Sequence, residues 1–303
     1  MLSSKAMNAP NNLKSRGILF HVAGLWMLSA LDSTGKYLVM GGLSVLMVAW
    51  VRYSVHMVLM TAVVLPRRGR ALFKTRSLPK QLLRGFLMIT TTVLFFSVLR
   101  RLPLAEGTAL NFMAPLFLMA MAPWLLGEPN RLHRWLGVLT GFIGMLVVVR
   151  PGSALDPVGV MLGVLTALFF AFFQVSTRLV AEDDPLTTNY YGGLFGTITL
   201  SLALPLFWET PQLSPWQWLL LGSTGITGFL GHWLQIVAYS RTPATLLAPF
   251  SYLQIVAAAT LGWLVFGQLP GLATALGIGL ICAAGAAVAI IEARRSPFKA
   301  RTA

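Results

Sequence analysis

Ten long apolar blocks follow one another along the chain, with short polar segments between them. Each block has the roughly 20 residues that a helix needs to cross about 30 Å of hydrocarbon. The blocks cover residues 17–38, 44–65, 82–101, 105–126, 132–150, 158–179, 188–208, 216–239, 244–267 and 272–292. Prolines lie near most of the boundaries, where a helix should end. The pattern predicts an all-α polytopic membrane protein with ten transmembrane helices.

Composition supports this class and excludes others. Hydrophobic residues make up 56% of the 303 residues and charged residues only 11%, against about a quarter charged in soluble domains. The net charge of +14 would suggest a nucleic-acid partner on a soluble protein, but the basic residues concentrate in the polar segments and tails. Cys282 is the only cysteine, which excludes an intrachain disulfide. We therefore expect no nucleic-acid partner.

The distribution of basic residues predicts the orientation. Ten is even, so both ends of the chain lie on the same side of the membrane. If that side is the cytoplasm, eighteen of the 23 Lys and Arg residues lie on the cytoplasmic side, as the positive-inside rule requires. The tails 1–16 and 293–303 are therefore expected in the cytoplasm. A cleaved signal peptide is the alternative for the first block, but that block carries polar residues at helical spacing from Gly17 onward.

The chain contains an internal repeat, seen when it is shifted by 140 positions. Residues 103–140 then echo residues 243–280. The coinciding pairs are Gly85–Gly225, Arg101–Arg241, Pro103–Pro243, Gly127–Gly267, Glu128–Gln268, Leu136–Leu276 and Gly137–Gly277. We expect two five-helix repeats, over residues 17–150 and 151–292. Because five is odd, the second repeat is inverted relative to the first, which is the architecture of secondary transporters with a midplane substrate site.

The first block carries a polar stripe. Trp26, Ser29, Ser33 and Lys36 fall on one helical face, which should look into the bundle because polar groups are costly against lipid. Asp32 precedes Lys36 by four residues, so the two could form a structural ion pair. The alternative is that they are gating or coupling charges.

Later blocks add further polar and aromatic positions. Pro115 has no N–H to offer the carbonyl of Asn111, so this site is either a substrate-facing break or a kink healed by neighbouring helices. Threonines can instead bond their own helix, glutamines can hold helices together, and a lone histidine can be a neutral hydrogen-bonding group. The predicted substrate-binding residues are Trp26, Ser29, Thr92, Phe95, Asn111, Phe170, Gln174, His232, Gln235, Tyr239, Tyr252 and Gln254, and the predicted gating or kink residues are Asp32, Lys36, Pro115 and Pro249.

The motifs of enzymes and ATP-driven pumps are missing from the sequence. It contains no HExxH, no GxSxG and no GxxxxGK[ST], and no pair of mid-membrane acids. We therefore expect no catalytic residues, no metal site and no cofactor. Transport would draw on a substrate or ion gradient.

Several of these positions resemble a known family. Lys36 ends the first block, Arg52 lies within the second, and the run from Asn111 through Pro115 to Gly127 and Glu128 is followed by Gly137 and Gly144. In these features the chain is similar to EamA-type proteins of the drug/metabolite transporter (DMT) superfamily, and within them to bacterial YddG-type aromatic amino-acid exporters. The second repeat departs from the first, with Ile255 opposite Pro115 and Gln268 opposite Glu128.

The resemblance implies alternating access between two inverted halves and a place in the bacterial inner membrane. The first hypothesis is a monomeric exporter of amino acids, above all aromatic and bulky apolar ones, with membrane lipids as its surroundings. The alternatives are an exporter of drugs, nucleosides or other metabolites, and a lipid-handling protein or channel.

Overall fold

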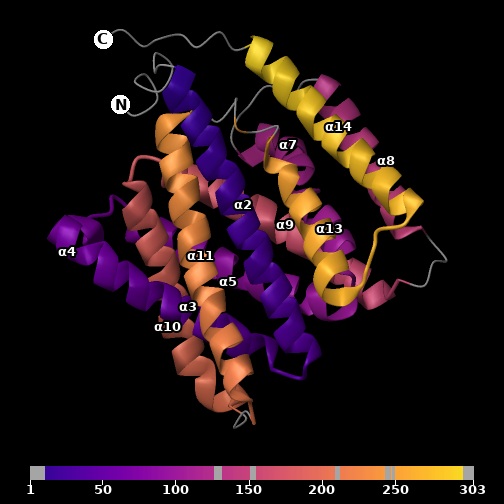
Figure 1. Cartoon of the computed structure of the whole chain (residues 1–303). Helices are drawn as coiled ribbons and strands as arrows, with labels where there is room; N and C mark the ends of the chain where they lie inside the picture. Colours follow the sequence, from indigo (N-terminus) through magenta and orange to yellow (C-terminus); the bar gives the residue numbers. More distant parts are fainter. Residues whose placement is uncertain are drawn as a thin grey trace, which may run out of the picture.

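A computed structural model describes residues 11–125, 132–150, 155–208, 212–242, 247 and 250–295, and all the regular secondary structure in this part of the chain is helical (Figure 1). The first half contains α2 (Asn11–Met40), α3 (Val45–Val63), α5 (Leu78–Arg101), α6 (Leu104–Asn111), α7 (Ala114–Leu125) and α8 (Leu132–Val149). The second half contains α9 (Pro157–Leu179), α10 (Pro185–Phe207), α11 (Pro215–Arg241), α13 (Leu253–Phe266) and α14 (Leu272–Arg295). The short α4 (Leu65–Arg68) and the 3₁₀ turn η1 (Gly69–Phe73) connect α3 to α5.

The prediction of an all-α polytopic fold is confirmed. Each of the ten apolar blocks overlaps at least one of these helices. The fourth block contains both α6 and α7, and in the ninth block, 244–267, α13 covers only Leu253–Phe266. Within the described part of the chain, four stretches are long and apolar enough to span a membrane by length and composition, namely Val45–Phe73, Leu78–Arg101, Leu104–Met121 and Pro157–Leu179. Three further apolar helices are shorter, over Trp135–Val149, Leu253–Phe266 and Leu272–Val288.

Three helices of the second half start with a polar cap followed by proline. The side chain of Asp156 accepts a hydrogen bond from the Val158 N–H before α9, and Asp184 does the same for Leu186 before α10. Ser214 forms a capping box with Gln217 at the start of α11. A capped first turn followed by proline satisfies backbone donors that have no partner within the helix. These residues therefore set where each span begins.

The fourth span is broken in its middle. α6 ends at Asn111, Phe112 and Met113 form a turn, and α7 begins at Ala114. Pro115 is the second residue of α7, and its missing N–H leaves the Asn111 carbonyl without the usual helical donor. Irregular backbone at this depth is tolerated where it faces protein or a cavity.

Each span of the first half has a counterpart in the second half, and the contacts between helices follow this pairing. The 140-residue offset recurs at helix ends, since α5 and α11 end at Arg101 and Arg241 and α8 and α14 start at Leu132 and Leu272. α2 packs along α11, and its counterpart α9 packs along α5, the counterpart of α11 (Figure 1). α3 packs on its counterpart α10, and α8 on its counterpart α14. Because each half contributes five spans, this arrangement is that of inverted repeats.

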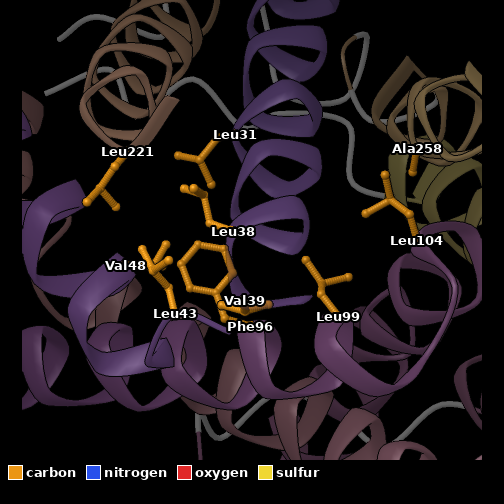
Figure 2. Close-up of a cluster of buried hydrophobic side chains, with 10 residues drawn as sticks. All are labelled: Leu31, Leu38, Val39, Leu43, Val48, Phe96, Leu99, Leu104, Leu221 and Ala258. Atoms are coloured by element: carbon orange, nitrogen blue, oxygen red, sulfur yellow. The ribbon is translucent and has the colours of Figure 1, made fainter. Parts of the chain in front are cut away.

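A hydrophobic core fills one end of the bundle, where α2 ends and α5 ends. We call this end of the bundle the Lys36 end. The opposite end, where α2 begins and α11 ends, is called the Tyr239 end. Figure 2 shows the side chains of this core, which come from α2, α3, α5, α6, α11, α13 and the turn after α2. They are Leu31, Leu38, Val39, Leu43, Val48, Phe96, Leu99, Leu104, Leu221 and Ala258. Six helices are thereby held together at the Lys36 end.

Candidate functional site

Two adjoining cavities lie between the halves. The central pocket, of about 140 Å³, is lined by Leu28, Leu31, Asp32, Arg52, Met88, Thr91, Thr92, Phe95, Asn111, Phe170, Phe173, His232 and Gln254. The vestibule, of about 620 Å³, lies toward the Tyr239 end and is lined by Arg68, Arg84, Thr177, Val180, Ala181, Asp183, Asp184, Pro185, Leu186, Thr188, Asn189, His232, Trp233, Gln235, Ile236, Val237, Tyr239 and Ser240. His232 lines both cavities. His232 therefore lies where the two cavities adjoin.

The central pocket holds one acid and one cation. Arg52 on α3 donates a hydrogen bond from Nη1 to Oγ1 of Thr92, at 3.2 Å, and Thr92 also shares one with the hydroxyl of Tyr53. The guanidinium lies 5.4 Å from the ring centre of Tyr53 and 5.9 Å from that of Phe96. Asp32 on α2 lines the same pocket and interacts electrostatically with Arg52. The pocket is thus equipped for a ligand that carries both charges.

The rest of the central pocket combines aromatic rings with unpaired polar atoms. Phe95 lines it, and Phe170 and Phe173 are stacked with ring centres 5.7 Å apart. The Oδ1 atom of Asn111 and the Nε2 atom of His232 are buried without a hydrogen-bond partner among the described residues. Leaving a buried polar atom unpaired costs about 1–3 kcal/mol, so these atoms are suited to bind a ligand's polar groups.

The vestibule has an exposed mouth and an apolar wall. At the mouth Arg68 and Asp184 form an ion pair at 3.4 Å, with side chains 50% and 41% exposed. Trp233 and Ile236 form part of the wall on α11. This end of the bundle therefore gives access to the interior.

A histidine that the sequence analysis did not single out joins α2 to α11. The Nδ1 atom of His21 lies 2.6 Å from Oε1 of Gln235, and its Nε2 atom lies 3.1 Å from the hydroxyl oxygen of Ser251. The ring also packs edge-on against Tyr239. In the tautomer that fits, Nδ1–H donates to Gln235 and Nε2 accepts from Ser251. The only sequence signal for this role is a polar residue in an apolar block.

The expected ion pair between Asp32 and Lys36 is not formed, which corrects that interpretation. Lys36 is 2% exposed, and its Nζ donates to the carbonyl oxygens of Leu99 and Leu102, at 2.7 and 2.6 Å. These carbonyls lie at the end of α5, where helix carbonyls lack helical partners and attract cations. The ammonium also lies 5.3 Å from the ring centre of Phe266.

A buried acid accompanies Lys36 at this end. Glu106, in the first turn of α6, is 7% exposed and accepts a hydrogen bond from Thr274 of α14 at 3.2 Å. Its carboxylate also interacts electrostatically with Lys36. The Lys36 end is therefore held closed by the polar contacts of Lys36 and Glu106 in addition to the hydrophobic core.

The other predicted residues fall into three groups. The structure brings Asp32, Thr92, Phe95, Asn111, Phe170, His232 and Gln254 to the central pocket, and Gln235 and Tyr239 to the vestibule. Trp26, Ser29, Gln174, Tyr252, Lys36 and Pro115 are not among the lining residues. Trp26 is 38% exposed, and Ser29 is buried and donates to the carbonyl of Gln254. Pro249 lies outside the described residues.

Several cavity residues were not predicted as site residues, and two of them, Arg84 and Phe173, were missed because their side chains looked ordinary in the sequence. Arg84 belongs to a run of basic residues that reads as an orientation signal, and Phe173 is one of several phenylalanines in an apolar block. The structure places Arg84 in the vestibule and Phe173 in the central pocket.

Comparisons with known proteins identify similar chains. The family model of the EamA-like transporter family matches residues 15–150 and 157–290. A riboflavin transporter of Vibrio cholerae is 30% identical over 90% of this chain and 94% of its own length. An S-adenosylmethionine uptake transporter of Rickettsia bellii is 26% identical over 91% and 94% of the two chains. The pseudopaline exporter CntI of Pseudomonas aeruginosa is 30% identical over 73% and 78%.

A solved crystal structure has the same fold. It superposes with a TM-score of 0.65 at 22% sequence identity and covers 97% of this chain and 99% of its own. At that identity the likeness concerns the fold alone.

Proposed function

The chain belongs to the EamA-like transporter family and is a secondary transporter of small metabolites, and we propose that its substrates are amino acids with aromatic or bulky apolar side chains, which it exports. This is the substrate class of YddG-type exporters. One observation carries the proposal, namely that Asp32 and Arg52 line the same small pocket as three phenylalanines.

The central pocket suits each part of such a molecule. Asp32 would bind the ammonium group, and Arg52 the carboxylate, for which a guanidinium offers a matching planar fork. The apolar side chain would lie among Phe95, Phe170 and Phe173. In pockets of this kind a few polar groups set orientation while apolar walls supply most of the contact.

Transport would proceed by alternating access. The vestibule is accessible at the Tyr239 end, whereas the Lys36 end is filled by the hydrophobic core and Lys36. We propose that the repeats 17–150 and 151–292 rock about the central pocket in the bacterial inner membrane. With the tails 1–16 and 293–303 in the cytoplasm, the vestibule faces the cytoplasm, where an exporter loads its substrate.

A larger metabolite with an aromatic ring system is the second candidate. The names of two relatives specify riboflavin and S-adenosylmethionine. The vestibule has a volume within the range of about 300–1,000 Å³ that is common for ligand pockets, and it meets the central pocket at His232. A long ligand could therefore occupy both cavities at once.

The test is counterflow of labelled phenylalanine into proteoliposomes preloaded with each unlabelled amino acid in turn. We expect saturable uptake, reduced roughly tenfold or more in Asp32→Asn and Arg52→Gln, since a charge-assisted hydrogen bond contributes about 1.5–3 kcal/mol. Thr92→Ala should also reduce uptake. Thr90→Ala is the matched control, because the hydroxyl of Thr90 bonds the carbonyl of Phe86 in its own helix and lies outside both cavities.

The outcomes separate the candidates. Uptake of riboflavin or S-adenosylmethionine, with none of any amino acid, would replace the first candidate by the second. Ion conductance in planar bilayers or lipid movement in a scrambling assay, without saturable uptake, would contradict both and favour a channel or lipid-handling protein.

A further inference from the structure

Arg84 is a buried cation without an acidic partner in the described part of the chain. It lines the vestibule and is only 8% exposed. The ion pairs found among the described residues are Arg68–Asp184, Arg76–Glu182 and Arg101–Asp156, and none includes it. A charge inside a membrane protein is costly unless it is compensated, and such charges commonly mark a substrate or ion path.

The two acids that line the vestibule are already engaged. Asp183 accepts hydrogen bonds from three groups in the segment 75–81, which are the Thr75 hydroxyl, the Arg76 backbone N–H and the Gln81 side-chain amide. Asp184 caps α10 and pairs with Arg68. Neither carboxylate is therefore left to neutralise Arg84.

The guanidinium of Arg84 is held in a fixed orientation. Its Nε donates to the Thr177 hydroxyl and its Nη1 to the Thr188 carbonyl, each at 3.1 Å. Its central carbon Cζ lies over the ring of Phe173, 4.7 Å from the ring centre. A guanidinium has five N–H donors, so three of them, including both on Nη2, have no hydrogen-bond partner among the described residues. An oriented fork with free donors is suited to a carboxylate.

Two further polar groups of the vestibule lack a strong partner. Among the described residues, the Asn189 amide nitrogen has a single hydrogen-bond acceptor, the sulfur of Met60 at 3.8 Å. The Nε2 atom of His232 is buried and unpaired, and His232 is close enough to Arg84 to interact with it electrostatically. Gly192 makes room for the guanidinium, because a Cβ there would lie 3.2 Å from Nη1 of Arg84. Asn189 and His232, like Arg84, line the vestibule.

The position of Phe173 links Arg84 to the central pocket. The same ring that lies under the guanidinium carbon belongs to a residue that also lines the central pocket, next to Phe170. We propose that Arg84, with Asn189 and His232, forms a second subsite in the vestibule that binds the carboxylate of the substrate before it reaches Arg52. The identity of that substrate rests on the function proposed above, whereas the carboxylate site rests on Arg84 and its neighbours.

The experiment measures binding to the full chain in lipid nanodiscs by isothermal titration. The probes are phenylacetate, which has a carboxylate and no amine, phenethylamine, which has the amine alone, and inorganic phosphate. We expect Arg84→Gln to weaken phenylacetate binding roughly tenfold or more and to leave phenethylamine binding unchanged. Arg68→Gln is the matched control, since it removes a vestibule arginine that is already paired with Asp184.

Two milder variants keep the proposal testable if Arg84→Gln does not fold. Arg84→Lys keeps the charge but not the fork, and we expect an intermediate affinity for phenylacetate. Asn189→Ala removes a single neutral donor, and we expect a loss of roughly two- to tenfold. Gel filtration and the melting temperature identify any variant that does not fold.

Four outcomes decide the proposal. Equal phenylacetate affinity in wild type, Arg84→Gln and Asn189→Ala would overturn it, and tighter binding of phosphate than of phenylacetate would overturn the assignment to a carboxylate. Arg84-dependent phenylacetate binding without phenylalanine counterflow would support the subsite and refute the proposed substrate. Normal counterflow with Arg84-independent binding would refute the subsite alone.

Discussion

At the scale of single residues, Lys36 holds the closed end together. Its ammonium bonds two carbonyls at the end of α5 and lies over Phe266 of α13. These contacts must break if α2 separates from α5 and α13 to open this end. The charge-assisted bonds, at about 1.5–3 kcal/mol each, therefore favour the closed state.

We expect Lys36→Met to shift the equilibrium toward opening at the Lys36 end by roughly tenfold or more. A Gln254→Cys reporter in the central pocket, in a Cys282→Ser background, would measure it through its labelling rate with a membrane-impermeant maleimide from that side. Lys80→Met, at an exposed lysine near the start of α5, is the control. An unchanged rate in Lys36→Met would show that Lys36 does not control this end.

A second residue-scale prediction concerns Asp183 and pH. Partial burial raises the pKa of this carboxyl, but the hydrogen bonds from Thr75, Arg76 and Gln81 lower it more, so the net pKa lies below its usual 3.8. A lowered pKa in the folded state stabilises the protein above pH 3.8, and this contribution is lost as the pH falls through the folded-state pKa.

The melting temperature should therefore fall as the pH drops below about 4, and Asp183→Asn should reduce that dependence while lowering stability at pH 7. Thermal unfolding in detergent between pH 7 and 3 would measure both effects. Asp183→Asn with the wild-type slope would exclude Asp183 as the responsible group.

At the scale of helices, α8 and α14 cross with their backbones in contact. A Cβ on Gly277 would lie 2.6 Å from the carbonyl oxygen of Gly144 and 2.8 Å from the backbone nitrogen of Val148. A Cβ on Gly279, two residues later, would meet nothing within 4 Å. Small residues at such crossings let membrane helices approach closely.

We expect Gly277→Ala to destabilise the protein by about 1–3 kcal/mol through overpacking. Gly279→Ala should be neutral or stabilising by up to about 1 kcal/mol, because alanine is the better helix former. Melting temperatures by intrinsic fluorescence would compare them. Equal shifts in the two variants would argue against the close crossing.

The helices themselves could be predicted from the sequence, because crossing a bilayer demands a minimum apolar length that is visible as ten blocks. That the helix is interrupted or kinked at Asn111 could also be predicted, because a missing N–H at Pro115 is a local property, whereas the choice between a break and a healed kink could not. The partners of Lys36 could not be predicted, since every residue has a backbone carbonyl and the sequence does not show which of them a side chain will contact. Arg84 was missed because the sequence does not show whether an arginine near the start of a helix faces lipid headgroups or a cavity.

At the scale of the whole molecule, the proposed orientation is directly testable. With the tails in the cytoplasm, Ser4→Cys should be protected from an impermeant maleimide in intact spheroplasts, and Gln212→Cys, between α10 and α11, should react. Both are made in the Cys282→Ser background, and permeabilised cells give the total signal. The reverse pattern would place the vestibule outside and contradict export by the proposed route.

The packing of α2 along α11 has a consequence for how the protein is made. His21 and Gln235, which bond one another, are 214 residues apart. α2 therefore leaves the ribosome and enters the bilayer long before its main neighbour α11 has been synthesised. Until the eighth span arrives, the imidazole of α2 lacks its amide partner, so slow translation or truncation before residue 215 should leave a nascent chain that quality-control proteases recognise.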